Sequence, residues 1–273
     1  MKSAWRTQGA AGRLRRARSV WREFARQSVK SAVRHFGYEL HAAGAVGRST
    51  AGFYRQVVTT GWRPRTVIDV GVAYGTGELY AAFPDAKYLL VEPLTEWWGH
   101  ITARFGDLDF VAAPVAATAF DGTVELHVYD DLEASSIPKD PARPVVDGGC
   151  RAVGARRLDS LCAEHSLEGP FLVKIDVQGG ELGVLAGAER LLDQVEVVVV
   201  EVAVGLRGEG IPNLAEVAAW AAREGFRVVD LCDGLAAPGS LALLQVDVAM
   251  VRCGSHLDGL FSEMVALAGG RVE

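Results

Sequence analysis

The sequence predicts a doubly wound α/β fold with a mostly parallel sheet, and three observations lead to that prediction. Short apolar runs recur from residue 66 onward, and they are nearly continuous, as in strands buried on both faces of a parallel sheet. Helical patterns separate these runs, which is the alternation of a doubly wound sheet. A glycine-rich turn, "VGVAYGTG" at 70–77, directly follows the first run. In such folds the ligand binds beyond the carboxyl ends of the strands.

The elements of this fold can be placed in chain order. We expect strands at 66–70, 88–92, 108–113, 171–176 and 195–202, in the sheet order 3-2-1-4-5. We expect helices at 77–83, 95–105, 157–165, 180–193 and 213–224. Two later apolar runs, "GFRVVDL" and "LALLQVDVAMVR", have no helical pattern between them and predict an antiparallel hairpin at one edge. Residues 123–129 are expected to add an outer strand, and 130–150 to form a long loop of the kind that is often functional.

The N-terminal part differs from the rest in charge. Residues 1–36 hold ten Lys/Arg and one acid, whereas the remaining chain holds 18 basic and 33 acidic residues. We therefore divide the chain into a basic helical extension, 1–47, and a ligand-binding domain, 48–273. Residues 13–36 can form a helix with a loose apolar stripe. Two roles remain open for it: peripheral contact with an anionic membrane, or packing on its own domain or on a second subunit of a homo-oligomer.

Composition excludes several classes of protein. The chain has 273 residues, 49% of them hydrophobic, which is enough for one sizeable core, and its net charge of −6 argues against general nucleic-acid binding. There is no run of about 18 apolar residues and no apolar signal region, so we expect neither a membrane span nor a secretory signal, and a cytoplasmic location. The four cysteines, Cys150, Cys162, Cys232 and Cys253, form no C-x-x-C pair, so we expect isolated thiols in a reducing compartment, and neither a zinc knuckle nor a disulfide framework.

The glycine turn indicates what kind of ligand is bound. Gly71, Gly75 and Gly77 give the spacing G-x-x-x-G-x-G, and not the G-x-G-x-x-G that a dinucleotide pyrophosphate needs. Ala73 occupies the place of the glycine that makes room for that pyrophosphate, and no positive residue is nearby. The turn therefore favours a ligand without phosphates.

Two carboxylates near this turn indicate which other groups the ligand contains. Glu92 ends the second strand and can accept hydrogen bonds from both hydroxyls of a ribose. Asp69 ends the first strand beside the glycine turn, where an acid could hold an amine. A ribose without phosphate, together with an amine, describes S-adenosylmethionine.

A lysine in the fourth strand points to a charged cluster. Lys174 lies in the apolar run "FLVKID", and a buried ammonium needs a partner. From the strand order we expect Asp69 and Glu201 to pair with it. Asp176 shares the pleat face of Lys174 and lies nearer the ligand, where it could act as a general base, orient a hydroxyl or contact the cofactor.

Five blocks now resemble a known family. "VIDVGVAYGTG", "YLLVEP", "RRLDSLC", "FLVKIDVQGGELGVLAGAERLL" and "VEVVVVEV", in that order, are similar to the FkbM family of S-adenosylmethionine-dependent methyltransferases over about residues 60 to 252. The fourth block, like the family's lysine–isoleucine–aspartate–x–glutamate–glycine signature, is the specific part. The resemblance implies a class I methyltransferase (Rossmann-like) fold.

The resemblance also implies roles for single residues. Asp69, Gly71 and Gly75 would line the methionine part of the cofactor, Glu92 the ribose, and Val115 and Ala116 the adenine. The chain departs from the family at Gln178, where glutamate is usual, which puts in doubt a mechanism that needs an acid there. It departs again at Val72 and Tyr74, where alanine and asparagine are common. We add Tyr74 to the cofactor contacts because its ring could cover the methionine end or narrow the acceptor pocket.

The resemblance implies an O-methyltransferase acting on a hydroxyl of a sugar, glycolipid or other polyhydroxylated natural product. Asp176 is the first candidate for the base and Glu201 the second. A variant in which these two carboxylates bind magnesium is the alternative that we do not favour. Two other functions stay open: a nicotinamide-dependent oxidoreductase, and a non-catalytic partner protein that keeps the pocket.

Overall fold

A computed structural model describes residues 48–138, 149–205, 210–236 and 242–269. The basic extension 1–47, with its expected helix and the domain boundary after it, lies outside the described residues. No helix among the residues that the structure does describe has the length and apolarity needed to cross a membrane.

The main sheet has seven strands in the order β3-β2-β1-β7-β8-β10-β9. Five of them run parallel, and β10 is antiparallel to both β8 and β9. The predicted strand order and edge hairpin are thus confirmed. The strands are β1 (Thr66–Val70), β2 (Lys87–Val91), β3 (Phe110–Ala113), β7 (Phe171–Ile175), β8 (Val195–Ala203), β9 (Phe226–Ala236) and β10 (Leu243–Arg252).

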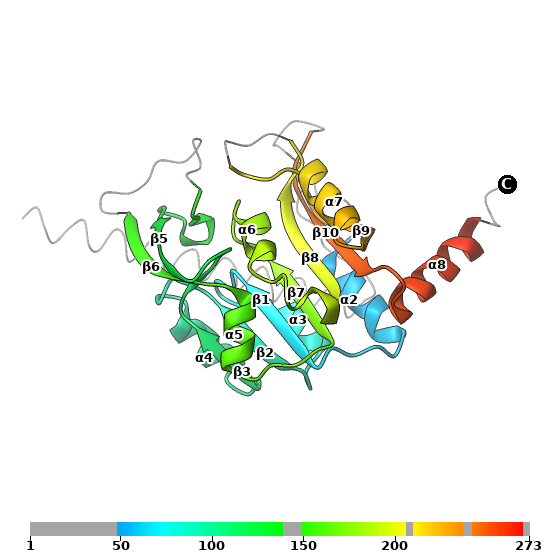
Figure 1. Cartoon of the computed structure of the whole chain (residues 1–273), viewed down its shortest axis with the longest axis horizontal. Helices are drawn as coiled ribbons and strands as arrows, with labels where there is room; N and C mark the ends of the chain where they lie inside the picture. The colour runs from blue at the N-terminus through cyan, green and yellow to red at the C-terminus, as the bar shows by residue number, and fades with distance from the viewer. Residues whose placement is uncertain (1–47, 139–148, 206–209, 237–241, 270–273) are drawn as a thin grey trace, which may run out of the picture. The chain divides into compact units, whose positions relative to one another are not determined.

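Helices cover both faces of this sheet (Figure 1). One face packs against α5 (Leu158–Glu164), α6 (Glu181–Ala186) and α7 (Leu214–Arg223). The other packs against α2 (Thr50–Thr59), α3 (Gly77–Ala82), α4 (Trp98–Phe105) and α8 (His256–Gly269). Because both faces are covered, strands such as β1 are buried at every position, which explains their continuous hydrophobicity.

A second, three-stranded sheet lies beside the cofactor end of the first. It has the order β4-β6-β5 and consists of β4 (Ala116–Ala117), β5 (Gly122–His127) and β6 (Cys150–Arg156). The predicted outer strand at 123–129 is therefore real, but it belongs to this sheet. Sequence reasoning missed β6, because most of its residues are exposed and its apolar pattern is weak.

Some boundaries differ from the predictions. The expected helix 180–193 ends at Gly187, and a short 3-10 turn, η2 (Leu192–Gln194), follows. An added Cβ at Gly187 would collide with the carbonyl oxygen of Thr118, so this position needs a glycine. The long loop contains η1 (Leu132–Ala134), while 139–148 lie outside the described residues. Helices α2 and α8 were not predicted.

Candidate active site

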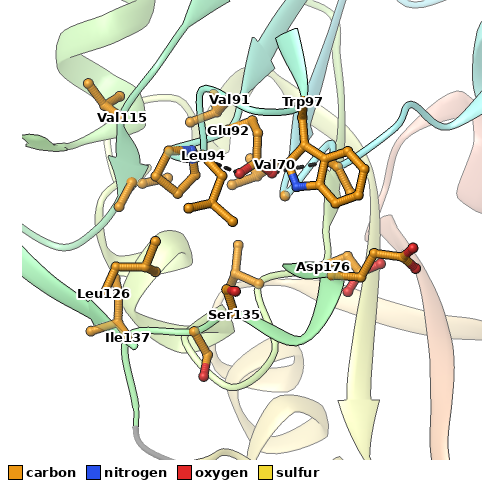
Figure 2. Close-up of a pocket in the computed structure, with 18 of the residues that line it drawn as sticks. Val70, Val91, Glu92, Leu94, Trp97, Val115, Leu126, Ser135, Ile137 and Asp176 are labelled. Atoms are coloured by element: carbon orange, nitrogen blue, oxygen red, sulfur yellow. Dashed lines mark hydrogen bonds between the residues drawn. The ribbon is translucent and has the colours of Figure 1, made fainter. Parts of the chain in front are cut away.

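A cavity of about 50 Å³ lies beyond the carboxyl ends of β1, β2 and β7. Its wall combines the glycine turn, the end of β2, the small sheet and the loop after β7. Figure 2 shows Val115 and Leu126 on one side of the cavity and Trp97 and Asp176 on the other. Glu92 projects toward it from the end of β2. The cavity therefore lies where an open α/β sheet binds its ligand.

The glycine turn brings two loops into contact. Gly71 has φ +77°, and its backbone N–H donates to the carbonyl of Val91 at 2.9 Å. A Cβ at Gly71 would collide with the backbone carbonyl of Asp176, so only glycine lets the ends of β1 and β7 approach this closely. Gly75, at φ +100°, is likewise closed in by the Phe105 ring. The turn thus places the Asp176 backbone at the floor of the cavity.

Glu92 is buried at the edge of the cavity and is held by backbone donors. Its Oε2 accepts from the N–H of Ala73 at 3.0 Å and its Oε1 from the N–H of Leu94 at 2.8 Å. Burial raises the pKa of this carboxyl to about 7, although both backbone donors lower it. Each oxygen keeps a second acceptor site, so the side chain can still bind a pair of hydroxyls.

Asp69 lies deeper than predicted. Its side chain is fully buried and is not part of the cavity wall. Its Oδ2 accepts from the Tyr80 hydroxyl at 2.7 Å, and its Oδ1 is 3.6 Å from Nζ of Lys174. Burial, and then Asp69, raise the pKa of Tyr80, so this hydroxyl stays protonated and donates. The assignment of Asp69 to the methionine part of the cofactor stays a prediction.

Lys174 pairs with Asp69, which is one of its two expected partners, and also with Asp176. Its Nζ lies 3.3 Å from Oδ2 of Asp176 and 3.6 Å from Oδ1 of Asp69. Burial opposes the charge of Lys174, but Asp176 and Asp69 outweigh it and raise its pKa. The pairing with Glu201 was wrong, because the register places Val199 beside Lys174 and Glu201 two residues further along β8.

Glu201 is held instead by two glutamine amides. Nε2 of Gln178 donates to Oε1 of Glu201 at 2.7 Å and also to Oδ1 of Asp176 at 2.9 Å. Nε2 of Gln245 donates to Oε2 of Glu201 at 2.9 Å. Gln178 therefore links the two predicted catalytic carboxylates, and its amide lies where a shared cation would have to bind.

Sequence reasoning missed a further carboxylate in the cluster that contains Lys174, Asp176 and Glu201. Asp247 lies in β10 directly opposite Glu201. Burial, and then the charge of Asp176, raise the pKa of Asp247 to about 8. Burial, Asp176 and Asp247 raise that of Glu201 well above its usual range. Burial and the neighbouring acids therefore make both carboxyls harder to ionise than an exposed acid. An ionisable residue inside an apolar run, the signal that identified Lys174, also marks Asp247.

The remaining predicted contacts divide into two groups. Val115 and Ala116 line the cavity, as their assignment to the adenine requires. Tyr74 does not line it; its ring packs edge-on against Trp97, with centroids 5.9 Å apart, and Trp97 does line it. Tyr74 can therefore influence the cavity through Trp97.

A second and larger cavity, of about 420 Å³, adjoins the first, and the two share Ala117 and Ile137. Its wall joins the loop after η1 to the segment that precedes α7, and much of it is apolar: Phe120, Pro138, Leu182, Ile211 and Pro212. Glycines 179, 180 and 183 form another part of it.

The match to known families decides the identity. The model of the methyltransferase FkbM domain matches residues 69–228, which is more than half of the chain. The chain belongs to the FkbM methyltransferase family. The chain has the class I methyltransferase fold, and S-adenosylmethionine is the cofactor that follows from membership of this family. The nicotinamide-dependent alternative is set aside on this match. No curated protein matches the chain in sequence.

Solved structures give more distant likenesses. The FkbM methyltransferase from Methylobacillus flagellatus KT is 12% identical, with a TM-score of 0.46; the match covers 68% of this chain and 43% of that one. Magnesium protoporphyrin IX methyltransferase from Synechocystis PCC 6803, solved with bound SAM, is 12% identical, with a TM-score of 0.39 and coverage of 73% and 76%. A putative RNA methyltransferase from Pyrococcus horikoshii is 12% identical, with a TM-score of 0.39 and coverage of 74% and 83%.

The donor set of the FkbM domain fits S-adenosylmethionine in chemistry. Glu92 offers a carboxylate for hydroxyls, and the described residues of the first cavity's wall include no lysine, arginine or histidine that would favour a phosphate. In size, the cavity is far below the roughly 300–1,000 Å³ of small-molecule pockets. Binding of S-adenosylmethionine therefore requires the cavity to widen.

Proposed function

We propose that this FkbM methyltransferase transfers the methyl group to a hydroxyl of a sugar, glycolipid or other polyhydroxylated natural product. The observation that carries the proposal is the carboxylate of Asp176. It is partly exposed at the cofactor cavity and is fixed there by Lys174 and Gln178. A hydroxyl is a weak nucleophile, so a base within hydrogen-bond reach accelerates its reaction. The bound cofactor supplies an electrophilic methyl group on a positively charged sulfur.

Asp176 suits the role of base better than Glu201 does. Lys174 and Gln178 hold the Asp176 carboxylate, while 31% of its side chain remains accessible to an acceptor. Glu201 resists ionisation because of its burial and its two acidic neighbours. A carboxyl that resists ionisation is less available to take a proton from the acceptor. We therefore keep Glu201 as the second candidate and infer that it orients Gln178.

The second cavity supports an acceptor larger than a single sugar ring. Its 420 Å³ adjoin the cofactor cavity, and its apolar wall would bury a hydrophobic part such as an aglycone or acyl chain. Its wall includes Ile137 and Pro138 of the 130–150 loop, and Gly210, Ile211 and Pro212 before α7. An acceptor with one hydroxylated and one apolar end fits this arrangement.

The position of Gln178 favours a mechanism without magnesium. An amide that donates to Asp176 and Glu201 supplies the positive partner that a cation would otherwise provide. We expect turnover to be the same with and without added magnesium. A loss of activity in EDTA that magnesium restores would contradict this mechanism.

An acceptor screen tests the proposed function. The full chain is incubated with isotopically labelled S-adenosylmethionine and with monosaccharides, glycolipids and hydroxylated polyketides, and products are analysed by mass spectrometry. We expect one methyl group per product, at an oxygen. Transfer to nitrogen or carbon alone would overturn the O-methylation proposal. If S-adenosylhomocysteine binds but no acceptor is methylated, the non-catalytic alternative gains support.

Once an acceptor is found, Asp176→Asn tests the base. We expect kcat to fall about 10²- to 10³-fold, because general-base catalysis contributes at this scale. The dissociation constant of S-adenosylhomocysteine, measured by calorimetry, should change less than about tenfold. The control is Asp193→Asn, which alters an exposed acid in η2. If Asp176→Asn keeps the wild-type kcat, another group takes the proton.

A further inference from the structure

Three side chains that line neither cavity converge on the small sheet. Cys150 is the first residue of β6 and lies directly opposite His127 of β5. Glu125 precedes His127 by two residues and so lies on the same face of β5. Sγ of Cys150 is 3.3 Å from Nδ1 of His127, and the ligand atoms of all three residues lie within 4.8 Å of one another. Leu126, between them in sequence, has the opposite orientation and lines the cofactor cavity.

We propose that Glu125, His127 and Cys150 bind one zinc ion. Thiolate, imidazole and carboxylate are the three ligand types of protein zinc sites, with metal–ligand distances of about 2.0–2.3 Å. Around a tetrahedral ion of this size, a sulfur and a nitrogen lie about 3.5–3.6 Å apart, and Sγ of Cys150 and Nδ1 of His127 are 3.3 Å apart, so only a small separation is needed to admit the ion. A hard cation such as magnesium prefers an all-oxygen set, so the thiol selects a softer metal.

A hydrogen bond between Cys150 and His127 would explain why these two side chains lie close together. It would not explain why the Glu125 carboxylate joins them. All three residues are at least partly exposed, so an ion can reach the site from solvent. Three protein ligands leave a fourth position for water.

The location gives the ion a structural role. His127 also makes two backbone hydrogen bonds with Ser136, of 2.9 and 3.1 Å, and Ser136 lines the cofactor cavity. His127 ends β5 and Cys150 begins β6, so a metal bound to both would join the two ends of the segment that connects these strands. Closing a loop of this length lowers the entropy of the unfolded chain and stabilises the folded one. The zinc ion would therefore hold the cavity wall formed by β5 and the η1 loop.

Metal titration of the full chain tests the site directly. The protein is prepared without a polyhistidine tag, kept reduced, stripped with a chelator and titrated with zinc by calorimetry. We expect one zinc ion per chain. Cys150→Ser and His127→Ala should each weaken binding at least tenfold, and Glu125→Gln should weaken it less. Cys253→Ser removes an exposed thiol elsewhere and should bind zinc like the wild type.

Two further measurements separate loss of ligand from loss of fold. Zinc in about 100-fold excess over its dissociation constant should raise Tm of the wild type by about 5 °C, but not that of folded His127→Ala. Cobalt should give a thiolate-to-metal absorption band that is absent in Cys150→Ser. The proposal is overturned if stripped wild type takes up no stoichiometric zinc, or if Cys150→Ser and His127→Ala bind it as tightly as wild type. None of these readouts depends on methyl transfer.

Discussion

Glu92 and Glu201 are both glutamates at the carboxyl edge of the sheet, yet different groups hold them. Glu92 accepts from two backbone N–H groups, and both donors lie within 19 residues of it. Glu201 accepts from the side-chain amides of Gln178 and Gln245, which lie 23 and 44 residues away. Burial raises the pKa of both carboxyls.

The difference shows two ways of fixing a carboxyl group. Backbone donors are positioned by the turn itself, so Glu92 is oriented wherever the glycine turn forms. Side-chain donors depend on which residues the neighbouring strands supply, so the Glu201 cluster can change by single substitutions. The cofactor side of the site is therefore expected to tolerate changes around it, and the acceptor side is expected to be sensitive to them.

The largest effect on affinity is expected at Glu92. Glu92→Ala should weaken binding of S-adenosylhomocysteine about 100-fold, or about 2.7 kcal/mol, because two hydrogen bonds to a carboxylate are lost. Isothermal titration calorimetry measures this constant. The control is Glu96→Ala, which removes a nearby glutamate paired with Arg151 on the surface and should leave the affinity within twofold. Wild-type affinity in Glu92→Ala would remove Glu92 from the cofactor site.

The next effect concerns Gln178. Gln178→Glu exchanges a donor to two carboxylates for a third carboxylate, and should lower Tm by about 5 °C at pH 8, or about 2 kcal/mol. Millimolar magnesium should restore part of this loss in the variant and leave the wild type unchanged, because three carboxylates can bind a cation.

Differential scanning fluorimetry can follow these changes. The control is Gln194→Glu, in which an exposed side-chain oxygen that accepts from Gly169 remains an acceptor. A Gln178→Glu variant as stable as wild type in EDTA would show that the amide bridge contributes little.

A further effect is expected in the pH dependence of stability. Folding raises the pKa of Asp247 to about 8 and that of Glu92 to about 7. Between their unfolded pKa values and these folded values, the folded state binds more protons than the unfolded state. Stability therefore falls as pH rises from about 5 to 8.

Urea unfolding at pH 5, 6, 7 and 8 measures this slope. In Asp247→Asn the decline should be smaller than in wild type by up to about 3–4 kcal/mol, since Asp247 no longer titrates. Asp121 and Glu164, whose hydrogen bonds lower their pKa values, contribute only at more acidic pH. Equal slopes in the variant and the wild type would show that Asp247 is ionised in the folded protein.

The smallest effect is expected at Tyr74. Tyr74→Asn, which restores the residue common in the family, should leave the affinity for S-adenosylhomocysteine within about tenfold, or about 1.4 kcal/mol. The reason is that Tyr74 packs on Trp97 and does not line the cavity. Trp97→Ala, which changes the cavity wall itself, should cost more in the same titration. A larger loss in Tyr74→Asn than in Trp97→Ala would place the tyrosine ring on the cofactor.

The sequence by itself determined the main sheet and the cofactor edge. Continuous apolar runs predicted five parallel strands and their order, because a strand that is buried on both faces is apolar at nearly every position. The glycine spacing and Glu92 predicted a ligand without phosphate, and the structure places Gly71 and Glu92 in the wall of one cavity. These features rest on short stretches of chain, so the order of residues is enough to identify them.

The tertiary structure alone decided which side chains meet across strands. Lys174 was given the wrong second partner because the register of β7 and β8 cannot be deduced from their apolar runs. The sequence likewise does not show that Asp247 lies beside Glu201, or Cys150 beside His127. Cys150 and His127 are 23 residues apart in sequence. Such contacts depend on the pairing of distant strands, and a shift of one residue would turn every side chain to the other face. The acid cluster and the candidate zinc site are therefore properties of the fold and not of any one segment.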